Sequence, residues 1–281
     1  MSFLSLGDRE AGAYLNWISI HGYWDPTHQH NNLSNYETCM AYTLDIEGPI
    51  LKTKYILGAL GYLGKIRIAY DEWNLRGWHH PSTDDDYLSP RDKNDINSSY
   101  TMADAVFNAC FLNQCLKHSD VVGMANFAPS VNTRGCIFTH PDGIVLRPTY
   151  FVFELYTQHM GNQVVDFWED GGDSFEVDHK GHAVNIPTLD VMVTKTSNEN
   201  DLRMAIVNRH PDQTRQMELD LEKISDLRCG TLYSLMGESK DAFNDVDRNM
   251  VRIEETPVNW NSDKGLRLEI PPHSVNVLVL T

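Results

Sequence analysis

The spacing of apolar residues along the chain changes once, near Gly161. Before that point, short apolar runs at residues 17–21, 66–70 and 120–127 alternate with segments in which apolar residues recur every three or four positions. Such runs are typical of buried strands, and the longer spacing is typical of helices. Strands separated by helices predict three parallel βα units.

The spacing of apolar residues is more regular in some of the helical segments than in others. Residues 101–117 have the most regular pattern, and Ser98 or Ser99 are the candidate N-caps. Residues 36–64 are also helical in pattern, with a break expected at Gly48-Pro49 and a helix from 51 to 63. Pro148 precedes a third helix over 149–160, which Gly161 ends.

From residue 163 onward the period is two, which predicts strands. Clusters of Gly, Asn, Asp and Pro separate these strands, as in an all-β sandwich. The expected strands are 174–178, 188–196, 202–209, 213–221, 231–235, 251–254, 266–270 and 274–280. The chain is therefore expected to be α/β plus all-β, with one domain at 1–161 and a β-sandwich domain at 162–281.

The parallel units fit either a β/α barrel or an open doubly wound sheet. No Gly-rich phosphate turn follows any of the three strands, which counts against the doubly wound sheet.

Polar and aromatic residues follow each of the three strands. The first strand runs into His21-Gly22-Tyr23-Trp24, the second into Asp71-Glu72-Trp73-Asn74, and the third into Asn126. In a β/α barrel, the carboxyl ends of the strands carry the catalytic groups. A carboxylate beside Trp and Asn suits a sugar, since the indole can pack on the ring and the amide can bind a 2-hydroxyl while the carboxylate faces the anomeric carbon.

Charge and cysteine content narrow the possible partners. The chain has 23 basic and 39 acidic residues, a net charge of −16, which disfavours nucleic acid and anionic membranes but is compatible with a neutral sugar. No apolar run is long enough to span a membrane, and the first residues do not resemble a signal peptide. Five scattered cysteines without a CxxC motif fit a reducing, cytoplasmic compartment.

These motifs resemble a known family. Residues 8–165 are similar to the second half of the catalytic barrel of glycoside hydrolase family 51, the α-L-arabinofuranosidases. Three segments carry the resemblance: residues 17–24 (WISIHGYW), 70–74 (YDEWN), and the helix-and-strand unit between Ala103 and Asn126. The later part, including Leu268-Glu269-Ile270-Pro271-Pro272-His273-Ser274-Val275, resembles the C-terminal domain of that family. The resemblance implies the last three units of a (β/α)8 barrel followed by a β-sandwich.

The resemblance also implies a retaining mechanism with Glu72 as the nucleophile. It implies that Tyr23 hydrogen-bonds Glu72 and that His21 lines the floor of the site. The expected substrate-binding residues are His21, Tyr23, Trp24, Asn74, Trp78 and Asn126, and the expected substrate is an arabinose-containing saccharide. Packing at the rim of the barrel is an alternative role for Tyr23, and burial in the core is an alternative for His21.

One catalytic carboxylate is missing from the sequence. The acid/base Glu of the family lies in a Gly-Asn-Glu motif, which is absent, and Glu37 and Glu47 fall on helical segments. Retaining hydrolysis needs two carboxyl groups about 5–5.5 Å apart. We therefore expect an N-terminal barrel-half chain, a homo-oligomer, or both, because a half barrel exposes strand edges and an apolar face. The alternative is a non-catalytic remnant or a sugar-binding subunit.

A metal site is the other alternative. The loops after the first two strands hold several potential ligands: His21, Asp25, His28, His30, His79 and His80. However, HExxH is absent and the Cys/His spacing is not that of a zinc finger. We expect neither a metal nor a cofactor.

Overall fold

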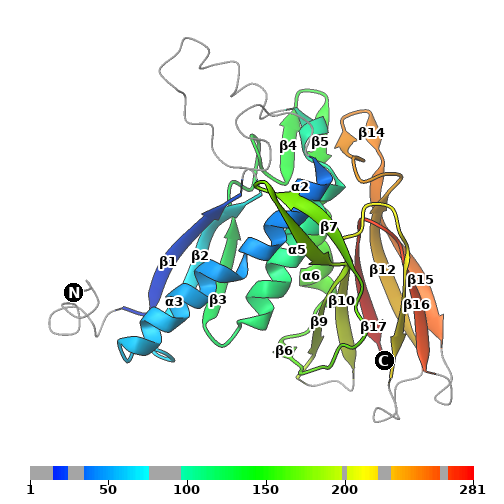
Figure 1. The fold of residues 1–281 in the computed structure, drawn as a ribbon. Helices are drawn as coiled ribbons and strands as arrows, with labels where there is room; N and C mark the ends of the chain where they lie inside the picture. The colour runs from blue at the N-terminus through cyan, green and yellow to red at the C-terminus, as the bar shows by residue number, and fades with distance from the viewer. Residues whose placement is uncertain (1–14, 25–34, 76–95, 198–200, 221–228, 260–264) are drawn as a thin grey trace.

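A computed structural model describes residues 15–24, 35–75, 96–197, 201–220, 229–259 and 265–281. In these residues the fold is mixed, with helices between two kinds of sheet (Figure 1). No helix among them is long and apolar enough to cross a membrane.

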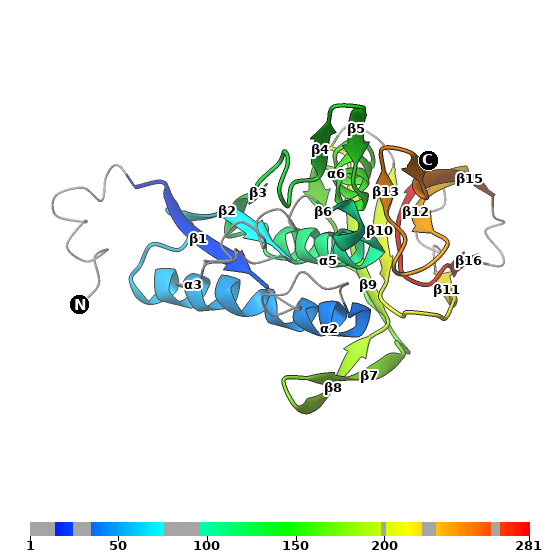
Figure 2. The ribbon, with the colours of Figure 1, turned by 90° about the horizontal axis from the view of Figure 1, so that it is seen from above.

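The first sheet is parallel and has the order β1-β2-β3. Its strands are β1 (Trp17–Tyr23), β2 (Arg67–Asn74) and β3 (Val122–Phe127). Helices α2 (Tyr36–Ala41) and α3 (Glu47–Ala59) connect β1 to β2, and α5 (Met102–Lys117) connects β2 to β3. The predicted alternation of strand and helix is thus present, and the helices lie on one side of the sheet (Figures 1 and 2).

Two details of the helices differ from the sequence-based expectation. Helix α3 begins at Glu47 and continues through Gly48-Pro49, because Pro49 occupies the first turn, where its missing N–H costs no hydrogen bond. Helix α5 is capped by Thr101 and not by Ser98 or Ser99. The Thr101 side chain accepts from the backbone N–H of Ala103, and Asp104 accepts from the Thr101 N–H.

The second sheet is antiparallel, with six strands in the order β15-β12-β17-β10-β9-β6. A smaller sheet of β11 (Arg215–Leu219) and β16 (Leu266–Ile270) packs on its outer face. The six strands are β6 (Gln163–Val164), β9 (Leu189–Lys195), β10 (Leu202–Asn208), β12 (Cys229–Gly237), β15 (Val251–Asn259) and β17 (Ser274–Leu280).

Helices α5 and α6 (Pro148–His159) fill the space between the parallel and antiparallel sheets, as Figure 1 shows. Alternation along β17 explains how the sheet is buried on both faces: Val275 and Val277 pack toward the helices, whereas Leu278 and Leu280 pack toward β11 and β16.

Several further strands are short, and most of them were not expected from the sequence. They form hairpins or brief extensions outside the central sheets: β4 (Ile137–His140), β5 (Gly143–Leu146), β7 (Ser174–His179), β8 (His182–Pro187), β13 (Asn244–Asp245) and β14 (Arg248–Asn249). Of these, only β7 falls in a predicted strand.

Candidate functional site

The candidate site lies at the carboxyl ends of β1, β2 and β3, on the side of the sheet away from the helices. The side chains of His21 and Glu72 are each 48% exposed there, and Asn126 is exposed beside them. The sheet therefore presents polar groups on one face and a packed core on the other.

An extra residue in β2 determines which side chains reach the exposed face. Ile20 pairs with Tyr70, but the next residue, His21, pairs with Glu72, so Asp71 has no counterpart in β1. On the other side, Ala125 pairs with Tyr70 and Phe127 with Trp73. Such a β-bulge reverses the direction of every later side chain in the strand.

The bulge changes which residues of this segment face the helices. Before the bulge, Ile68 and Tyr70 are buried against the helices; after it, Trp73 and Leu75 are buried there. Without the extra residue, Glu72 would share the face of Tyr70 and point into the core. The bulge thus places the Glu72 carboxylate on the exposed face.

Two side chains from β1 contact Glu72. The Tyr23 hydroxyl donates to Glu72 Oε2 at 3.0 Å, the contact that the family resemblance implied. His21 Nδ1 lies 3.6 Å from the same oxygen. Both neighbours approach Oε2, which fixes the orientation of the carboxylate.

Asp71 and Ser19 extend this cluster, and neither was singled out from the sequence. The Ser19 hydroxyl donates to Asp71 Oδ1 at 2.7 Å, and His21 Nε2 lies 3.2 Å from the same atom. The imidazole of His21 therefore lies between the Asp71 and Glu72 carboxylates. The signal for Ser19 was its position two residues before His21, on the same face of the strand.

The predicted roles of the tryptophans at this site require correction. Trp73 is fully buried and stacks on Phe111 of α5, with ring centroids 3.7 Å apart. Trp24 is 7% exposed and packs against Phe111 and Phe107. Neither indole presents a face for a sugar ring, because the residues beside His21, Tyr23 and Glu72 point toward the helices.

Asn74 is also buried, at 3% exposure. Its side-chain amide donates to the backbone carbonyls of Ala128 and Arg134 at 3.1 and 3.3 Å. These bonds connect the end of β2 to the segment after β3, so the amide nitrogen is engaged in the structure and does not face the open side. Arg134 in turn lies with its guanidinium carbon 5.5 Å from the Tyr23 ring.

The remaining predicted residues fall into two groups. His21, Tyr23 and Asn126 lie on the exposed face with Glu72. Trp78 and the potential metal ligands Asp25, His28, His30, His79 and His80 lie outside the described residues. Within the described part of the chain, no group of three or more His, Cys, Asp or Glu side chains is arranged to hold a metal.

Two cavities of about 620 Å³ lie elsewhere, in the part of the molecule built by β9 and the segment at 164–173. Their described lining residues do not include Glu72 or its neighbours. Among the described residues, the candidate site is an exposed face of the parallel sheet.

Comparison with known proteins gives the relatives of the chain. A family model described as the alpha-L-arabinofuranosidase C-terminal domain matches residues 71–274. The chain is 27% identical over 217 residues to a probable alpha-L-arabinofuranosidase C of Aspergillus niger, covering 75% of the chain and 39% of that protein. It is 24% identical over 277 residues to an exo-alpha-(1->6)-L-arabinofuranosidase of Bifidobacterium longum, covering 92% of the chain and 51% of that protein.

Among solved structures, the chain resembles a thermostable GH51 alpha-L-arabinofuranosidase from Thermotoga petrophila. The TM-score is 0.70 at 24% identity, over 95% of the chain and 53% of that structure. The chain therefore spans between about two fifths and half of the length of these relatives.

Proposed function

Because the chain belongs to the alpha-L-arabinofuranosidase C-terminal domain family, matched over residues 71–274, we propose that it is the nucleophile-bearing part of a retaining α-L-arabinofuranosidase. Its proposed reaction releases terminal arabinofuranosyl residues from plant polysaccharides or oligosaccharides. The observation that carries this proposal is the exposed Glu72 carboxylate, held by Tyr23 at 3.0 Å.

In the proposed reaction, Glu72 attacks the anomeric carbon and forms a glycosyl-enzyme, which water then hydrolyses. Tyr23 and His21 both approach Oε2, so we assign Oε1 as the attacking oxygen. By donating to one oxygen, Tyr23 keeps the carboxylate from rotating as the sugar arrives. Asn126, on the neighbouring strand, is assigned to the sugar hydroxyls.

Asp71 is an unsuitable second catalytic carboxylate. It is adjacent to Glu72 on the same strand and is engaged by Ser19 and His21. The acid/base must reach the leaving-group oxygen from another side of the sugar than the nucleophile. We therefore assign Asp71 to positioning His21, and the acid/base Glu to a chain that carries the Gly-Asn-Glu motif absent here.

We further propose that the parallel sheet is the last three βα units of a (β/α)8 barrel, with a boundary to the β-sandwich at Gly161. The order β1-β2-β3 and the helices on one side support this assignment. On the other side, Trp17 and Met124 are 41% and 39% exposed. An N-terminal barrel half, or a second copy of the chain, would cover that face.

The scattered cysteines, four of which are buried, support a place in the reducing cytoplasm. The competing proposal is a non-catalytic remnant or sugar-binding subunit, which the absence of Gly-Asn-Glu favours. The adjacent reading frame distinguishes the two: an upstream frame encoding a barrel half with Gly-Asn-Glu supports a split enzyme.

The direct test is an assay with an aryl α-L-arabinofuranoside. The purified chain alone should be inactive, and the chain mixed with a supplied N-terminal half should turn over. Glu72→Gln should abolish that turnover, whereas Glu176→Gln, an exposed glutamate of β7, should leave it unchanged. Activity of the chain alone would show that the chain itself contains the acid/base residue. Activity of the complex with Glu72→Gln would show that Glu72 is not the nucleophile.

A further inference from the structure

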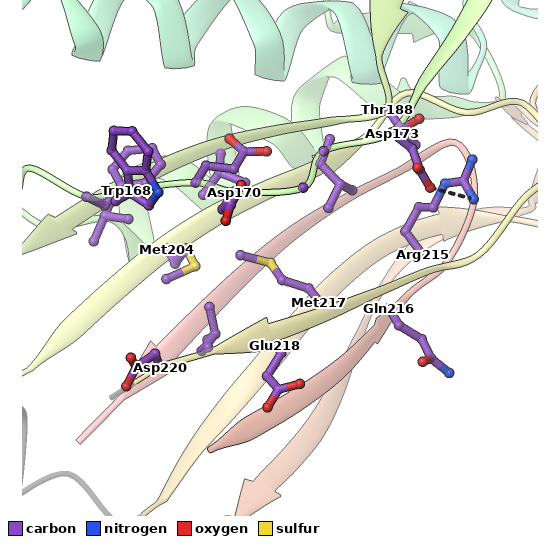
Figure 3. A pocket seen from close by; sticks show the side chains of 18 of the residues that line it. Trp168, Asp170, Asp173, Thr188, Met204, Arg215, Gln216, Met217, Glu218 and Asp220 are labelled. Atoms are coloured by element: carbon purple, nitrogen blue, oxygen red, sulfur yellow. Dashed lines mark ion pairs between the residues drawn. The ribbon is translucent and has the colours of Figure 1, made fainter. Parts of the chain in front are cut away.

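A second feature lies far from Glu72, in a groove beside β11. One wall is the segment 165–173, the other is β11, and the floor is formed by β9 and β10 (Figure 3). Its volume is about 620 Å³. We call it the β11 groove.

The floor of the β11 groove is apolar and incompletely covered. Leu189, Val191 and Leu202 are only partly buried, although they pack on the core cluster between the two antiparallel sheets. Among the described strands, six form the inner sheet but only β11 and β16 form the sheet that faces it. The outer layer therefore leaves part of the inner sheet exposed, at the position of the groove.

The wall formed by β11 presents a strand edge. Every residue from 215 to 220 lines the groove. If only one face of the strand lined it, alternate residues would do so, because successive side chains point to opposite faces. In the described structure β11 pairs with β16 alone. Alternate backbone N–H and C=O groups on its other edge therefore point into the groove, where a further strand can bind them.

The orientation of the β11 side chains defines what such a strand must carry. Met217 and Leu219 point toward the floor, while Gln216 and Glu218 are exposed. A strand placed beside β11 in the same sheet would alternate in the same way. Its inward residues must be apolar to cover the floor.

Its outward residues would meet a strongly acidic rim. The carboxylates around the groove are Asp166, Glu169, Asp170, Asp173, Glu218 and Asp220. Arg215 is the one basic residue among the described lining residues, and it is paired with Asp173 at 3.4 Å. Glu218 is paired with Arg267 of the neighbouring β16 at 3.3 Å. Opposite charges on neighbouring strands stabilise pairing, so the outward residues should be Lys or Arg.

A buried polar atom marks one end of the groove. Thr188 is 1% exposed and lines the cavity, and its hydroxyl has no hydrogen-bond partner in the described structure. A backbone group of an incoming strand would supply that partner.

We propose that the β11 groove binds an extended polypeptide segment as an additional strand on β11, with alternating apolar and basic residues. The apolar residues cover the exposed floor, and the basic residues pair with the carboxylates of the rim. This inference is independent of the role of Glu72, because it rests on the strand edge, the floor and the rim alone.

The test uses a capped, fluorescein-labelled peptide of about nine residues in which Val alternates with Lys, a length that spans the β11 edge. Binding is measured by fluorescence anisotropy, and hydrogen exchange is measured on the full chain. The expected result is saturable binding with slowed exchange at residues 215–220. A peptide of the same composition, with its Val and Lys in separate blocks, should bind at least about tenfold more weakly because it cannot alternate across the edge.

The charge argument is tested with Asp166→Asn/Asp170→Asn, two exposed carboxylates of the rim, which should weaken binding about tenfold. The control is Glu176→Gln/Glu255→Gln, which removes two exposed carboxylates outside the groove and should leave binding unchanged. Equal binding of the alternating and blocked peptides, or unchanged exchange at 215–220, would overturn the proposal. Displacement of the peptide by arabino-oligosaccharides would also overturn it and assign the groove to sugars.

Discussion

The Tyr23 hydroxyl and Glu72 Oε2 are 3.0 Å apart and join two neighbouring parallel strands. Both residues reach the same face for different reasons: Tyr23 by simple alternation after His21, and Glu72 through the bulge at Asp71. The orientation of the carboxylate therefore depends on both strands.

Replacing Tyr23 with Phe removes this hydrogen bond but keeps the ring. We expect kcat/KM of the reconstituted complex to fall about 10- to 100-fold, which is the effect of losing one hydrogen bond to a charged group. The measurement is hydrolysis of the aryl arabinofuranoside. Tyr55→Phe on α3, at a residue that is 68% exposed, is the control. Equal rates for both variants would show that Tyr23 only packs at the rim.

Gly22 lies between His21 and Tyr23 and faces the core. A Cβ there would collide with the Tyr70 hydroxyl and the Trp24 ring. We expect Gly22→Ala to lower the free energy of unfolding by about 1–3 kcal/mol. In helix α3, a Cβ at Gly48 meets nothing within 4 Å, so Gly48→Ala should leave stability unchanged or raise it slightly. Urea unfolding, followed by circular dichroism, measures the free energy of unfolding of both variants. A Gly22→Ala variant as stable as the unsubstituted chain would contradict the packing argument.

Phe111 of α5 packs against β2, the strand that carries Glu72, on the helix side of the sheet. Its ring stacks on Trp73 and meets the edge of Tyr70, with centroids 3.7 and 5.0 Å away. Phe111→Ala should cost about 3–5 kcal/mol of stability. The exposed Phe167→Ala, at a residue that is 44% exposed, should cost less than about 0.5 kcal/mol. Similar unfolding midpoints for the two variants would refute this assignment.

Glu47 and His118 form a pH-dependent contact between α3 and the end of α5, 2.8 Å apart. The hydrogen bond with His118 lowers the pKa of Glu47 below its usual value. Because the folded-state pKa is the lower one, the contribution of Glu47 to stability is complete above the unfolded pKa and is lost as pH falls through the folded pKa.

Glu47→Gln should therefore destabilise the chain at neutral pH, by no more than about 1 kcal/mol because the carboxylate is 37% exposed and screened by water. The difference from the unsubstituted chain should disappear as the pH falls through the lowered pKa that Glu47 has in the folded state. Unfolding midpoints measured across pH test this, and Glu238→Gln, at an exposed glutamate elsewhere, is the control. A difference that persists in acid would indicate a cause other than ionisation.

The larger elements were predictable because their patterns are local. The runs at 17–21, 66–70 and 120–127 form the parallel strands, and helix α5 follows its periodicity. The missed hairpin of β4 and β5 has short strands in which nearly every side chain is exposed or partly exposed, so it lacks a clear alternation.

The burial of Trp24, Trp73 and Asn74 was not predicted, because residue type alone does not give the direction of a side chain. A signal was nevertheless present in β2. Its large apolar residues in the core cluster occupy positions 68, 70 and 73, followed by Leu75 just after the strand, and this change from even to odd numbers marks the bulge.

The bulge also has a consequence for engineering this strand. The motif Asp-Glu-Trp-Asn presents the Glu72 carboxylate on the exposed face only together with the one-residue offset that Asp71 introduces. Deleting Asp71 would retain the carboxylate, the indole and the amide in the same order, yet would turn Glu72 toward Phe111 and bring Trp73 to the surface. If these four residues were grafted into a regular strand, the residue types would be the same. The Glu side chain would then point into the core, and the Trp side chain would point to the surface.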